Sequence, residues 1–222
     1  MAFTAVFLAV VAAIVIWWLS HQRLASKPWL EEGVIGDLPA AGAPRTSTAK
    51  IGLGVFLAVA GSLFALFASA YTMRMHMGAD WRSMPVPSLL WINTGVLVAS
   101  SVALHRAQVA ARGNNMNGVR EAVLAGGLLA LAFLAGQLLA WRQLDAAGYF
   151  LASNPANSFF YLLTAVHGLH VLGGLVALAR AAGRVWSGED ADRVRLSVEL
   201  CAIYWHFLLF VWLVLFALLL HH

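Results

Sequence analysis

The chain has 222 residues, of which 61% are hydrophobic and only 11% are charged, and its formal net charge is +4. Soluble globular domains carry about 25% charged residues, so this composition excludes a soluble enzyme, a disordered segment and a nucleic-acid-binding module. The single cysteine, Cys201, excludes a disulfide framework and a cysteine-rich metal site. The composition is that of a helical membrane protein that crosses the bilayer several times.

Six apolar stretches are long enough to cross a membrane, since about 20 apolar residues span its ~30 Å hydrocarbon layer. None shows the alternation of a β-barrel strand, so we predict an all-α fold, a polytopic membrane helix bundle with one N-terminal helix and a five-helix core. The predicted spans are Ala2–Leu19, Ile51–Met73, Ser88–Ala110, Ala122–Trp141, Phe159–Ala181 and Leu200–Leu220. The chain accordingly divides into an N-terminal transmembrane helix (1–22), a cytoplasmic loop (23–50) and the five-helix core (51–222).

The first span resembles a secretory signal peptide, but no positive charge precedes it. Trp17 and Trp18 stand where small residues would mark a cleavage site. Tryptophan is common where a helix meets the membrane surface. We therefore expect this stretch to remain as a membrane helix.

Positive charge is distributed unevenly among the connections between spans. The first, third and fifth connections hold most of the 14 Lys and Arg residues, whereas the second and fourth hold few. Connections rich in Lys and Arg stay on the cytoplasmic side of a membrane. We therefore predict that the odd-numbered connections are cytoplasmic and that both termini lie on the outer side.

The third and fourth spans carry polar residues that we interpret structurally. Asn93 in the third span and Gln137 in the fourth are expected to hydrogen-bond to neighbouring helices. Ser100 and Ser101 are interpreted as bonding back to their own helix. His105 falls near a cytoplasmic helix end, where reaching toward the membrane surface is sufficient to explain it.

The last two spans hold most of the ionisable residues inside the membrane, where such residues are costly and often functional. His167 and His170 are three residues apart and share one helix face, and Glu199 and His206 are seven apart and share another. One interpretation is a metal site, because imidazole binds zinc, copper and iron. The other, which we favour, is an interhelical network in which the imidazoles bond to main-chain carbonyls, Thr164 or Glu199.

Two motifs in these spans occur together in a known family. One is Glu199 followed by Tyr204-Trp205-His206-Phe207 and Trp212, and the other is Phe159-Phe160, Thr164, His167-Gly168-Leu169-His170-Val171 and Gly174. Shorter matches precede them, and together they cover about Lys50 to Leu220. This part of the chain resembles subunit III of cytochrome c oxidase and related haem–copper oxidases.

The resemblance implies an accessory transmembrane subunit of a proton-pumping haem–copper terminal oxidase in aerobic respiration, which stabilises the catalytic subunit and supports proton uptake. Its implied partners are the catalytic subunit I and the copper-bearing subunit II, which hold the haem and copper, while this chain binds no redox cofactor. Membrane lipids, a bound phospholipid and a larger respiratory supercomplex are further partners that the resemblance allows. The implied location is the bacterial inner membrane, with no catalytic and no metal-binding residue in the chain.

The resemblance also defines the expected site. A buried polar network would lock the fifth and sixth spans together. Its primary members are His167, His170, Glu199 and His206, and its secondary candidates are Asn93, Gln137, Thr164 and Trp205.

Three positions depart from the family pattern. Ala60 replaces a glutamate of the first core helix, Ala165 replaces a glycine, and Leu209 replaces a common aspartate. Two alternatives remain open beside the oxidase: a subunit III-like protein of a nitric oxide reductase or quinol oxidase, and a stand-alone histidine-rich membrane metalloenzyme. The retained Glu199–His206 pair favours the cytochrome c oxidase type over the quinol oxidase type.

Overall fold

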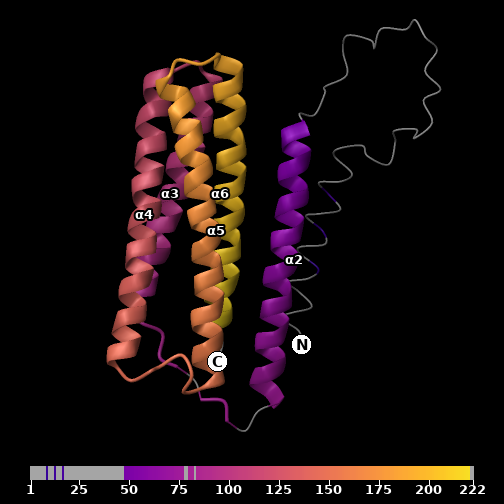
Figure 1. Ribbon diagram of the computed structural model, residues 1–222, viewed down its shortest axis with the longest axis vertical. Coiled ribbons are helices and arrows are strands. Elements are labelled where there is room, and N and C mark those ends of the chain that lie inside the picture. The colour runs from indigo at the N-terminus through magenta and orange to yellow at the C-terminus, as the bar shows by residue number, and fades with distance from the viewer. Residues whose placement is uncertain are drawn as a thin grey trace, which may run out of the picture. The chain divides into compact units, whose positions relative to one another are not determined.

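The computed structural model describes residues 48–77, 80–82 and 84–220, together with Ala9, Ala13 and Trp17. Most of the predicted first span and of the loop after it therefore lies outside the described residues. The regular structure of the described part is entirely α-helical, which confirms the predicted all-α fold. The five long helices are α2 (Thr48–Met77), α3 (Leu89–Arg112), α4 (Met116–Ala146), α5 (Pro155–Trp186) and α6 (Ala191–Leu220) (Figure 1).

Each predicted span of the core coincides with one of these helices. Most of the helices begin or end beyond the predicted span, because an apolar stretch marks only the part of a helix that faces hydrocarbon. Among the described helices, α2, α4, α5 and α6 are long and apolar enough to cross a membrane. Helix α3 has 24 residues but carries more polar side chains in its interior, and these prove to be central to the site.

The chain divides into two compact units, residues 1–65 and 66–222. The described part of the first unit consists of Ala9, Ala13, Trp17 and the first part of α2. The second unit holds the end of α2 and all of α3, α4, α5 and α6. Every polar residue named above as a site candidate belongs to the second unit.

Helices α3 to α6 form a four-helix bundle. Helix α3 packs against α4 and α6, and α5 packs against the same two helices, so the four close into a ring around one core. The connections are short, which makes successive helices antiparallel (Figure 1). Asn114, between α3 and α4, has φ 57°, a left-handed conformation that asparagine adopts more readily than most residues.

Asparagine side chains cap the first turns of two of these helices. The Asn115 side chain accepts a hydrogen bond from the Gly118 main-chain N–H at the start of α4. The Asn154 side chain accepts one from Ala156 at the start of α5, where Pro155 occupies the first turn. Both arrangements satisfy main-chain donors that a helix start leaves unpaired.

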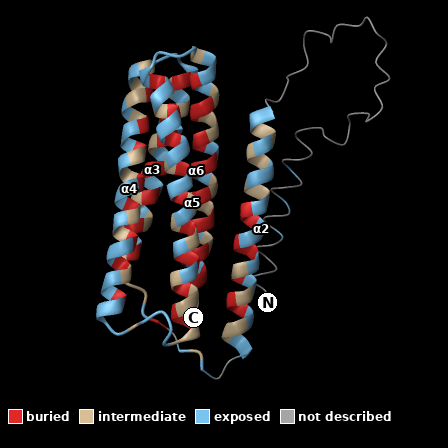
Figure 2. Ribbon diagram, in the orientation of Figure 1, coloured by how far each residue is buried: buried red, intermediate tan, exposed pale blue. Residues whose placement is uncertain are grey.

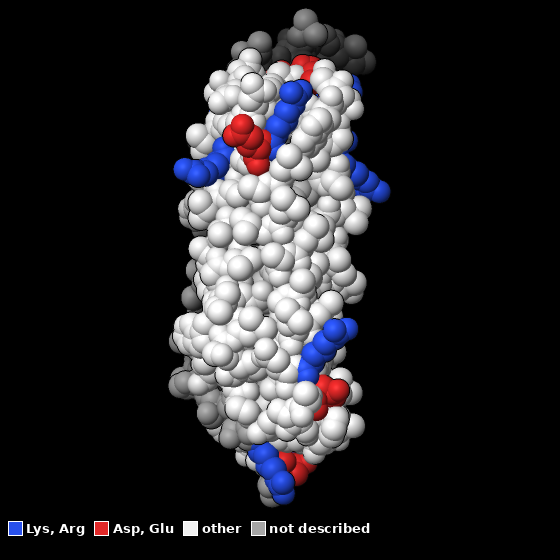
Figure 3. All heavy atoms as spheres, turned by 90° about the vertical axis from the view of Figure 1, so that its left-hand side faces the viewer, with Lys and Arg blue, Asp and Glu red and all other residues white. Residues whose placement is uncertain are grey.

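Burial follows the helix faces, with buried residues turned toward the centre of the bundle (Figure 2). Trp205, Trp212 and Phe133 are among the largest fully buried side chains, whereas large apolar residues such as Leu128 and Leu139 are exposed on α4. On the face shown in Figure 3, the charged side chains gather toward the two ends and leave an uncharged band between them. An apolar outer surface between charged ends is what a bilayer requires, and the chain is a membrane protein.

Candidate functional site

Asn93 of α3 makes the first polar contact between helices. Its side-chain amide N–H donates to the Gln137 side-chain oxygen of α4 across 3.4 Å, with both residues buried. The neighbouring Gly136 makes this approach possible, because a Cβ at that position would overlap the Asn93 side-chain oxygen. Asn93 and Gln137, both expected to bond to neighbouring helices, thus contact each other.

Two tryptophans of α6 donate to hydroxyl groups of α3. Trp212 Nε1 donates to Thr94 Oγ1 at 2.9 Å, and Trp205 Nε1 donates to Ser100 Oγ at 2.9 Å. Ser100 Oγ in turn donates to the Gly126 carbonyl of α4 at 2.8 Å. Ser100 therefore joins three helices, and the expectation that it bonds back to its own helix is wrong. Its hydroxyl has better-placed partners across the bundle because α3 packs between α4 and α6.

His206 of α6 also contacts α3. Its Nδ1 lies 2.6 Å from Ser101 Oγ, and its Nε2 lies 3.5 Å from Nδ1 of His105. The two imidazole rings are separated by 5.6 Å between centroids. Ser101 thus contacts α6 rather than its own helix, which corrects the second serine expectation. His105 takes part in an interhelical contact that the sequence interpretation did not include.

Nearer the N-terminal end of α6, charged groups continue the same contact. A Glu199 carboxylate oxygen lies 3.9 Å from a guanidinium nitrogen of Arg112, the last residue of α3. Arg195 donates to the Arg112 main-chain carbonyl at 2.8 Å and so satisfies an acceptor that the end of α3 leaves unpaired. The ion pair is partly exposed and at the limit of direct contact, so its contribution is small.

His167 connects α5 to α6 inside the core. Its Nε2 lies 3.1 Å from the Leu208 carbonyl oxygen, and since a carbonyl only accepts, this nitrogen carries the proton. The imidazole ring packs against Phe133 and Trp212, at centroid distances of 5.6 Å and 5.1 Å. The fully buried ring therefore acts both as a hydrogen-bond donor and as a packed aromatic surface.

His170 and Thr164 complete the contacts of α5. His170 donates through Nδ1 to the Val166 carbonyl of its own helix at 2.8 Å, and its own carbonyl accepts from the Tyr204 hydroxyl of α6 at 2.9 Å. Thr164 Oγ1 accepts from Trp141 Nε1 of α4 at 3.0 Å. Both residues thus take part in contacts between helices, His170 through its main-chain carbonyl.

The predicted site residues occupy separate places along the bundle. His167 lies in the core between α5 and α6, His206 is exposed beside α3, and Glu199 lies two turns from His206 near Arg112. Among the described residues, no group of three or more His, Cys, Asp and Glu is arranged to hold a metal ion. The arrangement is therefore one of dispersed contacts between helices: α3 contacts α4 and α6, and α5 contacts the same two helices.

Sequence reasoning missed three partners on α3, namely Ser101, His105 and Arg112. A signal for them was present in the spacing. Together with Thr94 they are separated by seven, four and seven residues, which places them along one helix face. Polar residues therefore recur along one face of α3 from Thr94 to Arg112, and each of these four contacts α6.

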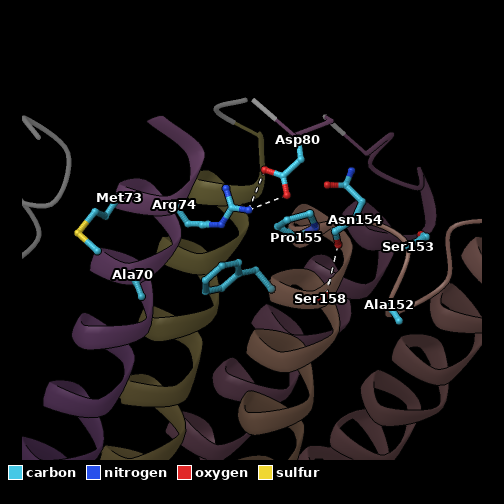
Figure 4. Close-up of a pocket in the computed structure, with 10 residues that line it drawn as sticks. Ala70, Met73, Arg74, Asp80, Ala152, Ser153, Asn154, Pro155 and Ser158 are labelled. Carbon is cyan, nitrogen blue, oxygen red and sulfur yellow. Dashed lines mark hydrogen bonds and ion pairs between the residues drawn. The ribbon is translucent and has the colours of Figure 1, made fainter. Parts of the chain in front are cut away.

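A hollow of about 650 Å³ lies at the opposite end of the second unit. It is lined by the end of α2, the segment after it, and the α4–α5 connection, and Arg74 points at Asp80 across it (Figure 4). Arg74 Nη2 lies 2.7 Å from each oxygen of the Asp80 carboxylate. These hydrogen bonds hold the pKa of Asp80 below its ordinary value.

Comparison with known proteins decides the family. The family model described as cytochrome c oxidase subunit III matches residues 46–222. Cytochrome c oxidase subunit 3 of a Synechocystis species is 29% identical over 210 residues, covering 89% of each chain. The Thermostichus vulcanus protein of the same name is 31% identical over 76% of this chain and 85% of its own. A probable cytochrome c oxidase subunit 3 of Mycobacterium bovis is 32% identical over 78% of this chain and 87% of its own.

The chain belongs to the cytochrome c oxidase subunit III family. This confirms the resemblance found in the two motifs of the last spans, and it favours neither the reductase and quinol oxidase alternatives nor a stand-alone metalloenzyme. The family match begins just before α2 and contains α3 to α6. The hydrogen bonds along α3 therefore belong to the part of the chain that defines a subunit III.

Within that part, the structure shows the surroundings of two positions at which the sequence departs from the subunit III pattern. Ala60 is only 4% exposed on α2, so its small side chain occupies a buried position. Leu209 is half-buried on α6, next to the Leu208 carbonyl that accepts from His167. At both positions the chain places an apolar side chain inside a membrane helix, which avoids the cost of a buried carboxylate.

Proposed function

We propose that this chain is the accessory transmembrane subunit of a proton-pumping cytochrome c oxidase, where it stabilises the catalytic subunit and supports proton uptake. The observation that carries the proposal is the family match over residues 46–222. The names of the curated relatives favour this complex over a nitric oxide reductase or a quinol oxidase. A tightly bonded bundle without a metal-holding group among its described residues is consistent with a supporting role.

The proposed topology has six transmembrane helices, with both termini on the outer side of the bacterial inner membrane. Residues 1–22 form the first helix, 23–50 a cytoplasmic loop, and 51–222 the core. The excess of Lys and Arg in alternate connections supports this orientation. Helix α3 crosses the membrane in this scheme because most of its polar groups contact α4 or α6 and are thereby shielded from lipid.

The proposed partners are the catalytic subunit I and the copper-bearing subunit II, with membrane lipids around the bundle. Haem and copper belong to those subunits, and a bound phospholipid and a larger respiratory supercomplex extend the proposal. In such an arrangement the cofactors perform the redox chemistry, while the accessory chain supplies packing and environment. This is the role for which a rigid, cross-linked bundle is suited.

The proposed role of the polar residues is to fix the relative positions of the helices. His167, His170, Glu199 and His206 do so together with Asn93, Gln137, Thr164 and Trp205. Hydrogen bonds between helices inside a membrane contribute about 0.6 kcal/mol each on average, so no single one dominates. Their number, spread over α3, α4, α5 and α6, is what supports a defined bundle geometry.

The function is tested by purifying the full chain with an affinity tag in mild detergent. We expect a complex that contains haem and copper in other subunits, oxidises cytochrome c and is identified by mass spectrometry. If the chain co-purified with a nitric oxide reductase, or with a complex that oxidises quinol, it would be assigned to that complex instead. Recovery of the chain alone, with stoichiometric metal that is lost in a His170→Ala variant, would replace the accessory role by a metalloenzyme.

The proposed network is tested with Glu199→Gln, because the amide keeps the size of the carboxylate but removes its charge. We expect a small loss of thermal stability, since the Arg112 contact is partly exposed. The matched control is Glu189→Gln, which weakens a comparable 3.9 Å contact to Arg184 outside this network. If Glu199→Gln changed neither stability nor association with the other subunits, Glu199 would not belong to the network.

A further inference from the structure

Two ionisable side chains are exposed in the middle parts of their helices. Among the described residues, only His105 and His206 are ionisable, exposed and at least seven positions from both ends of their helix. By contrast, α4 presents exposed Leu124 and Leu128 on either side of Gly126, whose carbonyl accepts from Ser100 of α3. The histidine pair therefore marks one side of the bundle as chemically different.

The pair forms a chain of polar contacts that leads outward from the bundle. Ser101 is buried, and its hydroxyl lies 2.6 Å from Nδ1 of His206, whose Nε2 lies 3.5 Å from Nδ1 of His105. With the hydroxyl as first donor, His206 donates to His105, and His105 keeps a proton on Nε2. Among the described residues, none accepts from that last N–H.

The charged residues beside these polar contacts indicate which kind of group would accept a hydrogen bond from the His105 Nε2–H. Arg106 is exposed next to His105, and Arg112 lies two turns further along the same face. A Glu199 carboxylate oxygen lies 3.9 Å from Arg112, and among the described residues Arg106 forms no ion pair. The local surface is thus basic, and its complement is a carboxylate or another strong acceptor.

Hydrocarbon cannot supply such an acceptor. A donor left without a partner in an apolar medium costs free energy, so polar residues at membrane depth face protein or water. Side chains of a helix tilt toward its N-terminus, so His105 points along α3 away from Arg112 and toward the middle of the membrane. A lipid headgroup beside Arg112 is therefore poorly placed for this donor, whereas a side chain on another transmembrane helix can reach it.

We propose that the outer α3–α6 surface, defined by Val102, His105 and His206, is where a transmembrane helix of a neighbouring oxidase subunit packs, with an acceptor, most favourably a carboxylate, opposite His105. The inference rests on the proposed function, because it requires other subunits. The inference adds to the proposed function the surface on which another subunit packs and the kind of group that this subunit places opposite His105. The polar chain would then continue from Ser101 through both histidines into the partner.

The surface is tested by placing a photo-reactive amino acid at Val102 in the full chain, within its native membrane. Val102 is 52% exposed and lies one turn from His105, and the matched control is Leu128 of α4, which is 66% exposed. We expect a cross-link from Val102 to another membrane subunit, formed several times more efficiently than from Leu128. Lipid adducts alone at Val102, or cross-linking no more efficient than from Leu128, would overturn the proposal.

The polar contact is tested with His105→Leu, measured as retention of the other subunits during detergent dilution. Within the chain, the described contacts of the His105 side chain are with His206 across 3.5 Å, so the isolated variant should lose only about 0.6 kcal/mol of stability. His206→Leu, which removes the same contact, is the control for that loss. Loss of one interhelical hydrogen bond predicts about threefold to tenfold weaker retention, partly restored in His105→Gln, which keeps a donor. Unchanged retention in His105→Leu would refute the contact.

The two proposals fail in different ways. If the unmodified chain brings no other subunit through purification, the proposed function fails. If the unmodified chain retains its partners while Val102 does not cross-link to them, only the assignment of this surface fails.

Discussion

The indole N–H of Trp205 donates to the hydroxyl of Ser100 across 2.9 Å, with both residues at 0% exposure. The Ser100 hydroxyl in turn donates a hydrogen bond to the Gly126 carbonyl, so one hydroxyl group connects α6, α3 and α4. In an apolar core a buried N–H without an acceptor is costly. These two hydrogen bonds therefore avoid the free-energy cost of a buried, unpaired indole N–H. They also fix the relative positions of three helices.

Ser100→Ala should destabilise the bundle by about 1–3 kcal/mol, because it leaves the Trp205 N–H unpaired and removes the bond to Gly126. The measurement is equilibrium unfolding of the purified chain in mixed micelles. Ser187→Ala is the control, since the exposed Ser187 hydroxyl donates only to the Gly183 carbonyl of its own helix, and we expect a change within about 0.5 kcal/mol. Equal effects of the two substitutions would contradict a special role for Ser100.

Gly174→Ala should destabilise the α5–α6 contact by about 1–3 kcal/mol. A Cβ at Gly174 would lie 2.7 Å from Tyr204 Cε1 and 2.8 Å from Trp205 Cζ3, and rigid rings within a packed core move with difficulty. The adjacent Gly173 has nothing within 4 Å of an added Cβ, so Gly173→Ala should be neutral or stabilise the helix by about 0.5–1 kcal/mol. Thermal unfolding of the pair provides the test, and two similar melting curves would disprove the close packing at Gly174.

His167→Leu should cost about 1–3 kcal/mol of stability, because it removes the hydrogen bond to the Leu208 carbonyl and the ring contacts with Phe133 and Trp212. The same substitution at the exposed His76, near the end of α2, should change stability little. Unfolding in detergent, followed by the fluorescence of the buried tryptophans, measures both. A His167→Leu protein as stable as His76→Leu would show that the α5–α6 connection at Leu208 contributes nothing.

The ion pair between Arg74 and Asp80 predicts a weak dependence of stability on pH. The pKa of Asp80 is lowered by its hydrogen bonds to Arg74, so its contribution is present above the ordinary aspartate pKa of about 3.9 and is lost as the pH falls through the lowered value.

The measurement is the melting temperature of the unmodified chain minus that of Asp80→Asn, recorded from neutral to acid pH and at two salt concentrations. A small positive difference at neutral pH should disappear in acid and shrink at high salt, since the pair is exposed. A difference that stays constant in acid would assign the effect to something other than the Asp80 charge.

The sequence predicted the helices and some of the site residues, but it did not predict their hydrogen-bond partners. The helices were predictable because apolar length is a local property, and five predicted spans coincide with α2 to α6. His167 and Thr164 were identifiable from their motif. Their partners, the Leu208 carbonyl and the Trp141 indole, were not, since a main-chain acceptor on another helix leaves no mark in the order of residues.

The tryptophans show the same limit. In a membrane protein they are expected at the surface of the bilayer, yet Trp205 and Trp212 are fully buried and donate to hydroxyls of α3. A buried indole requires an acceptor. Only the packing of α3 against α6 brings Ser100 and Thr94 within reach.

The amino-acid sequence by itself determined that this is a helical membrane protein, and its Glu–Tyr-Trp-His-Phe and His-x-x-His motifs identified the subunit III family. These conclusions follow from hydrophobicity and residue order, which are independent of how the helices pack. The tertiary structure decided which polar groups meet. His206 faces Ser101 and His105 of α3, because the rotation and depth of each helix are set by the packing of its neighbours.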